Sequence, residues 1–207
     1  MNIVILNGNP DPANAEFDRY IQRYQLKLHK TGHYVKSFQL REMRIAGFGE
    51  LDEPYPPKQT GFPLDDVRYI LNTLKETDLL VWASPLKQGL ISLLTKMVQS
   101  RINRYFQDNL SAHTDKWAAS PFVYRIPMIG VILQPESDST SQEVLLNRLT
   151  QERMAANLQT VLSFLITTNS SVTEAVCETF RSFDYRLYIE NTSNDFLAGS
   201  VHEFDSV

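Results

Sequence analysis

Three short stretches of uninterrupted apolar residues stand out in the first two-thirds of the chain. They run from Ile3 to Leu6, from Leu79 to Ala83 and from Ile129 to Leu133. A strand wetted on one face alternates apolar and polar residues, whereas a strand covered on both faces does not, so these runs predict buried strands of a parallel sheet. A further strand is predicted from Tyr34 to Leu40, where the alternation is less regular.

Helical spacing separates these strands. Apolar residues recur every three or four positions in three segments, as expected when one face of a helix packs on a sheet. They are Phe17, Tyr20, Ile21, Tyr24 and Leu28, then Val67, Ile70, Leu71 and Leu74, then Leu90, Leu93, Leu94, Met97 and Val98. A longer helix is predicted from about Ser141 to Leu165. This alternating order indicates an α/β fold, with a doubly wound parallel sheet between two helical layers.

The pattern is ambiguous after Thr167. The segment from Val172 to Phe180 fits a strand or a helix, and we favour a strand, the fifth of the sheet; the segment from Tyr185 to Ile189 is left open as a further strand. Residues 1–190 are predicted to form a single domain, followed by a peripheral tail at 191–207. A Gly- and Pro-dotted stretch at 47–63 predicts a long irregular loop.

Composition narrows the class of protein. The 207 residues carry 20 Lys and Arg against 24 Asp and Glu, a net charge of −4, which supplies no basic face for a nucleic acid. The apolar run at the N-terminus is too short for a signal peptide or a membrane span, so we expect a soluble, cytoplasmic protein without a membrane partner. Cys177 is the single cysteine and is interpreted as reduced and structural. The four histidines show no metal-ligand spacing, and no hydrolase motif is present, so no metal site is expected.

The ligand site of a doubly wound sheet lies outside the carboxyl ends of the strands, where the strand order reverses. This rule selects three loops, at residues 7–16, 84–89 and 134–139. The first passes directly from a buried strand into a helix, so its backbone amides and the positive helix end suit a phosphate. It is not a P-loop and lacks the GxGxxG spacing of dinucleotide-binding folds.

Two of these segments resemble a known family. The start from Leu6 to Phe17, with Gly-Asn-Pro after the strand, and the run Thr77-Asp-Leu-Leu-Val-Trp-Ala-Ser-Pro-Leu86, followed by Gly89, Lys96 and Arg101, are similar to flavodoxin-like NAD(P)H-dependent FMN reductases and quinone reductases. The resemblance covers about the first two-thirds of the chain. It implies a three-layer α/β/α flavodoxin-like fold, bound FMN, NAD(P)H as co-substrate, a small-molecule electron acceptor and a homodimer.

The resemblance also implies where FMN would bind. Backbone amides of Gly8, Asn9 and Asn14 would face the phosphate, and those of Leu86, Lys87 and Gln88 would face the ring edge. The full set of cofactor-binding positions is Gly8, Asn9, Pro10, Asp11, Asn14, Phe17, Pro85, Leu86, Lys87, Gln88, Gly89 and Gln134. Hydride transfer belongs to the cofactor, so no catalytic side chain is expected.

The sequence departs from the family at these same loops. Asp11 and Glu16 stand where the family has hydroxyl or basic residues, and two unit charges about 6 Å apart at an effective dielectric near 20 repel by roughly 2 to 3 kcal/mol. Asp11 before Pro12 also fits a helix N-cap, which would occupy the same amides. The aromatic residue expected near Lys87 is missing, and Gln134-Pro135 replaces the family's Thr-x-Gly.

Other residues of these segments have plainer interpretations. Trp82 is interpreted as core, Lys87 as exposed, Lys96 and Arg101 as surface charges, and residues 137–140 as a helix start. The aromatic residues of segment 107–126 (Trp117, Phe122, Tyr124) fit a dimer interface or plain packing. Two hypotheses of function follow: an FMN-dependent NAD(P)H oxidoreductase acting on quinones, flavin or similar acceptors, or a cofactor-free flavodoxin-like binding or assembly module.

Overall fold

The computed structural model describes residues 1–46, 65–114 and 126–181. Its centre is a six-stranded sheet made of β1 (Asn2–Asn7), β2 (Tyr34–Gln39), β3 (Leu79–Lys87), β4 (Leu90–Ile91), β5 (Met128–Gln134) and β6 (Leu162–Thr167). The order β2-β1-β3-β5-β6 is parallel throughout, and the two-residue β4 pairs antiparallel with the end of β3. This order is that of flavodoxin-like sheets, with the reversal between β1 and β3.

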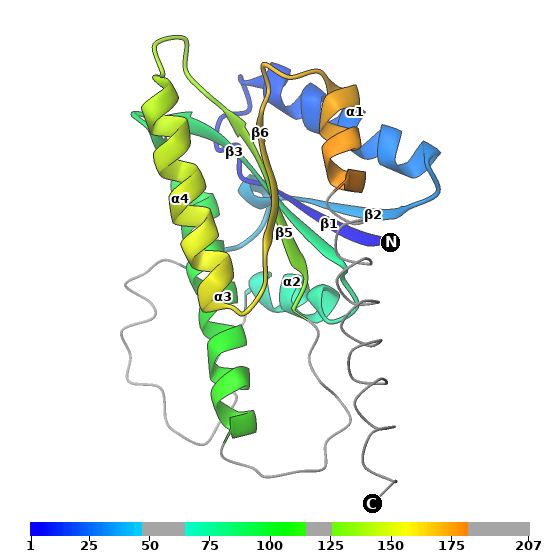
Figure 1. The fold of residues 1–207 in the computed structure, drawn as a ribbon, viewed down its shortest axis with the longest axis vertical. Helices are drawn as coiled ribbons and strands as arrows, with labels where there is room; N and C mark the ends of the chain where they lie inside the picture. The colour runs from blue at the N-terminus through cyan, green and yellow to red at the C-terminus, as the bar shows by residue number, and fades with distance from the viewer. Residues whose placement is uncertain (47–64, 115–125, 182–207) are drawn as a thin grey trace, which may run out of the picture.

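Helices cover both faces of the sheet (Figure 1). One face carries α1 (Ala15–Lys30) and a helix over residues 172–181, drawn in orange; the other carries α2 (Val67–Leu74), α3 (Leu93–Thr114) and α4 (Ser141–Asn157). A short 3-10 helix, η1 (Leu40–Glu42), follows β2. The predicted three-layer α/β/α flavodoxin-like fold is therefore confirmed.

Strand β1 shows why these runs form the middle layer. Ile3 and Ile5 pack into the core on the α1 side, while Val4 and Leu6 pack into the core on the α2–α4 side. All four are at most 2% exposed, which accounts for the absence of polar alternation. Trp82 of β3 is 2% exposed and belongs to the second of these cores, as predicted.

Two of the predicted elements near the C-terminus are wrong. The long helix ends at Asn157, and β6 occupies residues 162–167 as the fifth parallel strand. Residues 172–181, favoured as that strand, are helical. Ser171 and Glu174 form a reciprocal cap, with the Glu174 amide on Ser171 Oγ at 3.2 Å and the Ser171 amide on a Glu174 carboxylate oxygen at 2.7 Å. This Ser-x-x-Glu signature marks a helix start.

The start of α3 also differs from the prediction. Leu90 belongs to β4, and Leu90 and Leu93 are 68% and 67% exposed. Val98 is buried, as predicted, and the core face of the helix continues with Ile102 and Phe106. Its apolar residues therefore divide between the core and the surface at the carboxyl end of β3.

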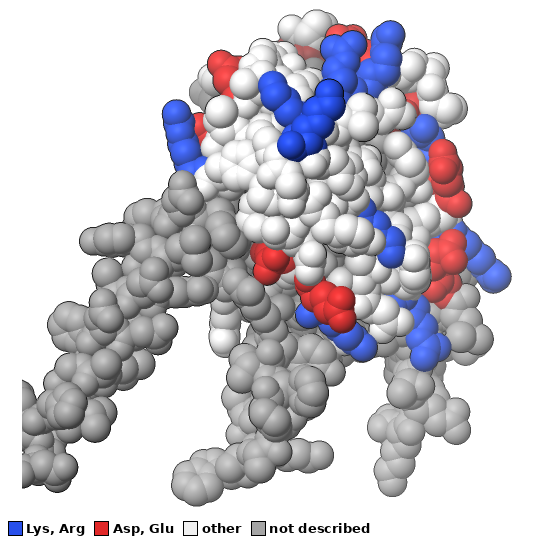
Figure 2. Space-filling view, turned by 90° about the vertical axis from the view of Figure 1, so that its right-hand side faces the viewer, with Lys and Arg blue, Asp and Glu red and all other residues white. Residues whose placement is uncertain are grey.

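The remaining predictions fall on other parts of the chain. The described residues do not include the predicted loop at 47–63, the aromatic residues between 115 and 125, the open segment at 185–189, the boundary at residue 190 or the tail at 191–207. Within the described residues no helix has both the length and the apolarity needed to cross a bilayer. On the α1 side, basic and acidic side chains are both present and spread over the surface (Figure 2).

Candidate functional site

A buried carboxylate organises the loop between β1 and α1. Asp18, in the first turn of α1, accepts hydrogen bonds from the side-chain amides of Asn7 at 2.8 Å and Asn9 at 3.1 Å. Arg41, after β2, pairs with its second oxygen at 2.8 Å and also contacts the Asn9 carbonyl at 3.4 Å. These bonds connect the loop to α1 through Asp18 and to the segment after β2 through Arg41. One feature of the sequence could have indicated that Asp18 is buried. It is a polar residue on the helix face that buries Phe17, Ile21 and Tyr24.

Hydrogen bonds inside the protein occupy the amides proposed to face a phosphate. The amide of Gly8 donates to the Ala83 carbonyl at 2.8 Å, and that of Asn9 donates to Asn7 Oδ1 at 3.0 Å. The amide of Asn14 donates to the Asp11 carbonyl at 3.1 Å. A phosphate at this loop would have to displace one of these acceptors for each amide it engaged, at a cost of about 1 kcal/mol or more for each bond broken.

Asp11 is not the N-cap of α1. That role belongs to Asn14, whose side-chain oxygen accepts from the Phe17 amide at 3.4 Å. Asp11 instead makes a local turn: its carboxylate accepts from the Ala13 amide at 2.8 Å, and its own amide donates to Asn9 Oδ1 at 3.1 Å. The helix therefore begins three residues later than predicted, at Ala15. The residue remains exposed, so its charge faces solvent and the neighbouring crevice.

The first turn of α3 packs closely against the β1 loop. Ser92 Oγ donates to the Gly8 carbonyl at 2.6 Å and lies 2.9 Å from Thr95 Oγ1. The Ser92 amide donates to Ser84 Oγ at 2.9 Å. A Cβ atom on Gly8 would lie 1.8 Å from Thr95 Oγ1, so glycine is required here by close approach. Ser92 and Thr95 were absent from the predicted site.

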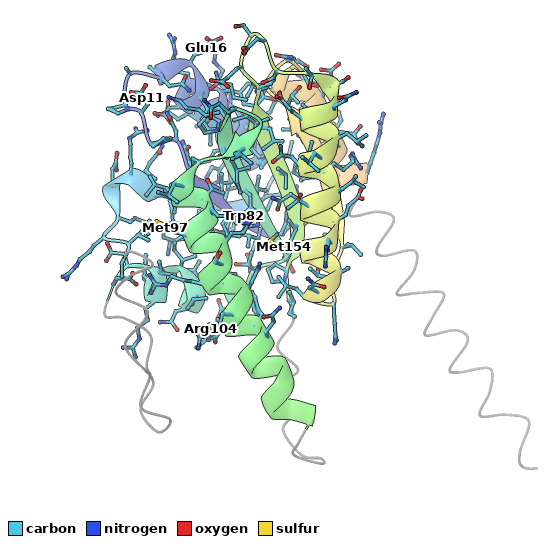
Figure 3. The ribbon with its side chains drawn as sticks, turned by 90° about the vertical axis from the view of Figure 1, so that its left-hand side faces the viewer. Asp11, Glu16, Trp82, Met97, Arg104 and Met154 are labelled. Atoms are coloured by element: carbon cyan, nitrogen blue, oxygen red, sulfur yellow. The ribbon has the colours of Figure 1, made fainter. Side chains whose placement is uncertain are left out.

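An apolar crevice of about 380 Å³ opens between this loop and the start of α3. It is of the size of small-ligand pockets. It brings together six of the predicted positions, namely Asn9, Pro10, Asp11, Asn14, Pro85 and Lys87, with six others, namely Leu90, Ile91, Ser92, Leu93, Leu94 and Met97. Figure 3 shows Asp11 and Glu16 at the end of the molecule where the β1 loop meets α1, and Met97 on α3.

The other predicted positions lie around the crevice or beneath it. Phe17 and Leu86 are buried in the two cores, and Gly8 is sealed against α3. The side chain of Gln134 joins the loops after β1 and β5, because Asn14 Nδ2 donates to its Oε1 at 2.6 Å. These residues position the crevice walls but do not line it.

The loop after β3 is likewise tied to the loop after β5 and to α4. The Gln88 amide donates to a carboxylate oxygen of Glu136 at 2.8 Å, and Asn147 Nδ2 donates to the Gly89 carbonyl at 2.8 Å. Gln88 and Gly89 both have positive φ, 52° and 73°, so this tight turn suits glycine at 89. The Gln88 amide, proposed for a ring edge, is therefore occupied by a carboxylate.

Arg101 does not have the predicted surface role. Its side chain is 4% exposed and pairs with Asp65, whose side chain is 2% exposed; Nη2 donates to Oδ1 at 2.8 Å. Asp65 also accepts from the amides of Ala46 at 2.8 Å and Val67 at 3.2 Å. Burial alone raises the pKa of Asp65, but the bonds from Arg101, Ala46 and Val67 outweigh it and hold that pKa below its ordinary value. Lys87 and Lys96 are exposed, as predicted.

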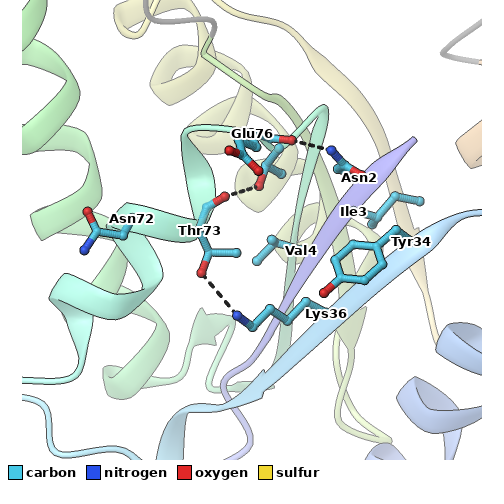
Figure 4. A pocket seen from close by; sticks show the side chains of 9 residues that line it. Asn2, Ile3, Val4, Tyr34, Lys36, Asn72, Thr73 and Glu76 are labelled. Atoms are coloured by element: carbon cyan, nitrogen blue, oxygen red, sulfur yellow. Dashed lines mark hydrogen bonds between the residues drawn. The ribbon is translucent and has the colours of Figure 1, made fainter.

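Two other hollows have more polar linings than the crevice and are less suited to an apolar ring. One, of about 590 Å³, lies beside the start of α4 and is lined by hydroxyl side chains and Glu136. The other, of about 360 Å³, lies between β1, β2 and α2 at the amino ends of the strands (Figure 4). Its one lysine, Lys36, is already bonded to Tyr69 Oη at 2.7 Å. Among the described residues, no group of three or more His, Cys, Asp and Glu side chains is placed to hold a metal ion.

Comparison with known proteins supports the fold. No protein-family model matches the sequence, and no curated protein matches it. Among solved structures, a flavone reductase is similar with a TM-score of 0.54 at 14% identity, over 88% of this chain and 59% of its own; the chain thus spans less than two-thirds of that protein. RosB, with bound 8-demethyl-8-formylriboflavin 5′-phosphate, has a TM-score of 0.53 at 13% identity, over 100% of this chain and 89% of its own.

An NAD(P)H:quinone oxidoreductase from Methanothermobacter marburgensis has a TM-score of 0.52 at 16% identity, over 81% of each chain. At these identities the likeness establishes the fold. The resemblance to flavodoxin-like FMN and quinone reductases, expected from the sequence, is confirmed at that level.

This fold implies a bound flavin, and the residues present fit the ring of that flavin but not its phosphate. The crevice walls made by Pro10, Leu90, Leu94 and Met97 are apolar and suit a flat aromatic ring. The β1 loop does not suit a phosphate, because its amides are bonded within the protein and Asp11 adds a negative charge.

Proposed function

We propose that this protein is a flavin-dependent NAD(P)H oxidoreductase that reduces a small planar acceptor such as a quinone or a flavin. The observation that carries this proposal is the apolar crevice at the carboxyl ends of β1 and β3, the place where a doubly wound sheet binds its ligand. The similar solved structures described as a flavone reductase, a quinone oxidoreductase and a flavin-binding protein support it.

The chain's own residues bind and orient the ring. A flavin in the crevice supplies the hydride chemistry. Leu90, Leu94 and Met97 exclude water from one side, and Pro10 and Pro85 present rigid apolar surface without an amide donor. Lys87 is the single cation among the described residues that line the crevice, and its charge favours a ring that gains electron density.

Hydride transfer in the presence of added flavin tests this function. Oxidation of NADH or NADPH is followed with riboflavin or FMN and a soluble quinone, for the wild type and for Leu90→Glu. Leu90 is exposed, so the change places a charge in the crevice without disturbing the core. We expect wild-type turnover and at least a tenfold loss in the variant.

Leu26→Glu is the matched control. Leu26 is 59% exposed on α1, across the sheet from the crevice, and the change there should leave turnover unchanged. Absence of turnover with either nucleotide, together with no flavin binding, would remove the proposed function. The second candidate function is a cofactor-free binding module, which the occupied amides of the β1 loop favour. Absence of both turnover and flavin binding would support that function instead.

We also propose a homodimer through the outer face of α4. Leu145, Leu146 and Leu149 are 54 to 60% exposed, whereas the buried side of the helix carries Asn147 and Gln151. Gln151 accepts from Gln99 Nε2 of α3 at 2.8 Å, so polar side chains join the two helices and leucines face outward. Such an exposed apolar row is typical of an interaction surface.

A second copy of the chain is the partner that this face fits. An apolar row is self-complementary, as a two-fold interface requires. Arg148 and Glu152 on this helix pair with each other at 3.3 Å in the single chain and can exchange partners across a two-fold axis. Leu90 and Leu93, which line the crevice, are exposed apolar side chains as well. Light scattering should give a dimer mass for the wild type and for Leu26→Glu, and a monomer mass for Leu145→Glu with Leu149→Glu. A monomeric wild type would contradict the proposed homodimer.

A further inference from the structure

The crevice favours an apolar ring, whereas the β1 loop does not favour a phosphate. The crevice is apolar, while every amide of the loop so far described donates to an acceptor within the protein. Resting on the proposed function, we infer that the site selects a flavin without a 5′-phosphate, so that riboflavin binds in preference to FMN.

The first argument is the saturation of the loop amides. Asn9 is fully buried, and its side chain bonds the Asp11 amide at 3.1 Å, the Asn14 carbonyl at 3.1 Å and Asp18. Asp11 in turn bonds the Ala13 amide at 2.8 Å. Because Pro10 and Pro12 have no amide hydrogen, the loop has few donors and already uses those named here. The phosphate of FMN would need these amides as donors, but the loop already uses them in bonds within the protein.

The second argument is charge. Asp11 lines the crevice, and its carboxylate is the acceptor of a local turn, which fixes its position. A phosphate monoester carries about −1.5 to −2 charge at neutral pH. Facing an exposed carboxylate a few ångströms away in a dielectric near that of water, this charge lowers affinity by roughly three- to tenfold. A ribityl hydroxyl is uncharged and incurs no such repulsion.

The third argument is that further carboxylates lie next to the loop, so that Asp11 is not the one negative charge there. Glu136, at the exit of β5, is bonded to the Gln88 amide, and Glu16 adds a second negative charge in the first turn of α1. Behind the loop, Arg41 is paired with Asp18, and Lys87 is the one cation among the described residues that line the crevice. The β1 loop itself therefore presents a negative charge to an entering phosphate, and the positive charge of Lys87 belongs to β3 rather than to this loop.

Titration of flavin fluorescence tests the inference without requiring turnover. The wild type is titrated with riboflavin, FMN and lumiflavin, which is the ring without a ribityl chain, at about 20 and 200 mM salt. We expect riboflavin to bind at least tenfold more tightly than FMN. Salt should narrow this ratio, because exposed charges are screened. Lumiflavin binding would show that the crevice holds the ring itself.

Asp11→Asn is the informative variant, because an asparagine oxygen can still accept from the Ala13 amide while the charge is removed. We expect it to tighten FMN severalfold and to leave riboflavin unchanged. Glu16→Gln is the matched control, since Glu16 does not line the crevice, and it should change the ratio less than twofold.

The possible outcomes separate the two proposals. FMN binding as tightly as riboflavin, or more tightly, would overturn the inference and leave the oxidoreductase proposal standing. An unchanged ratio in Asp11→Asn would overturn the role given to Asp11. Failure of all three flavins to bind would remove the proposed function and this inference with it.

Discussion

Replacing Gly8 by alanine tests how the crevice is built. A Cβ atom at this position would lie 1.8 Å from Thr95 Oγ1 and 3.1 Å from both Thr95 Cβ and Ser92 Oγ. Thr95 is 1% exposed and cannot swing into solvent, so the β1 loop must move away from α3. That movement breaks the 2.6 Å bond from Ser92 to the Gly8 carbonyl.

The magnitude follows from these two effects. Overpacking of a buried contact costs about 1 to 3 kcal/mol, and the lost hydrogen bond adds about 1 kcal/mol. For a chain of this length, each kcal/mol corresponds to about 2 to 4 °C in Tm. We therefore expect Gly8→Ala to lower Tm by about 5 to 15 °C and to weaken flavin binding, because the two walls of the crevice separate.

A double-mutant cycle isolates the contact. Thr95→Ala removes the atom nearest the new methyl group, so Gly8→Ala should cost at least 1 kcal/mol less in that background than in the wild type. Urea denaturation of the four proteins gives the four free energies of unfolding. An equal cost of Gly8→Ala in both backgrounds would refute the close approach of the β1 loop to α3.

Three further predictions concern stability. Arg101→Met leaves Asp65 buried without its cation and should cost about 3 to 5 kcal/mol in urea denaturation, whereas a cost under 1 kcal/mol would contradict the buried pair. Because the pKa of Asp65 is lowered in the folded protein, its contribution is present above the ordinary carboxyl value of 3.8 and is lost as the pH falls through the lower folded value; Asp65→Asn should remove part of the Tm loss seen as the pH falls below the ordinary value, and an unchanged profile would count against it. Gly130→Ala places a Cβ atom 2.4 Å from the Phe164 ring between β5 and β6 and should cost about 1 to 3 kcal/mol, measured by thermal denaturation; no loss would show that the ring moves freely.

The sequence predicts the first four parallel strands and the fold class because those features depend on local pattern. The runs at 3–6, 79–83 and 129–133 lack polar alternation, and each is a central strand. The pattern failed at 162–167 because apolar residues continue from the end of α4 into β6 with no Gly or Pro between them. The chain turns there at Gln159, which adopts a positive φ although it is not a glycine. A Ser-x-x-Glu cap at Ser171 was the available signal for the last helix.

The sequence predicted which loops form the candidate site, but it did not predict the hydrogen-bond partners of the residues in those loops. The rule for doubly wound sheets located the loops, and six of twelve predicted positions line the crevice. Which acceptor each amide meets depends on residues far apart in sequence, such as Asn14 with Gln134 and Gln88 with Glu136. The burial of Arg101 depends in the same way on Asp65, which lies 36 positions away.

The binding position of a flavin ring is the central claim, and methionine methyl groups report on it directly. The chain has five methionines, and Met97 is the one that lines the crevice, whereas Met154 lies between α3 and α4 in the core (Figure 3). With [13C-methyl]methionine, NMR spectra recorded during titration with riboflavin should show a ring-current shift of the Met97 signal while the Met154 signal stays in place. A saturating titration that leaves Met97 unmoved, or that shifts the core methionines instead, would contradict the account.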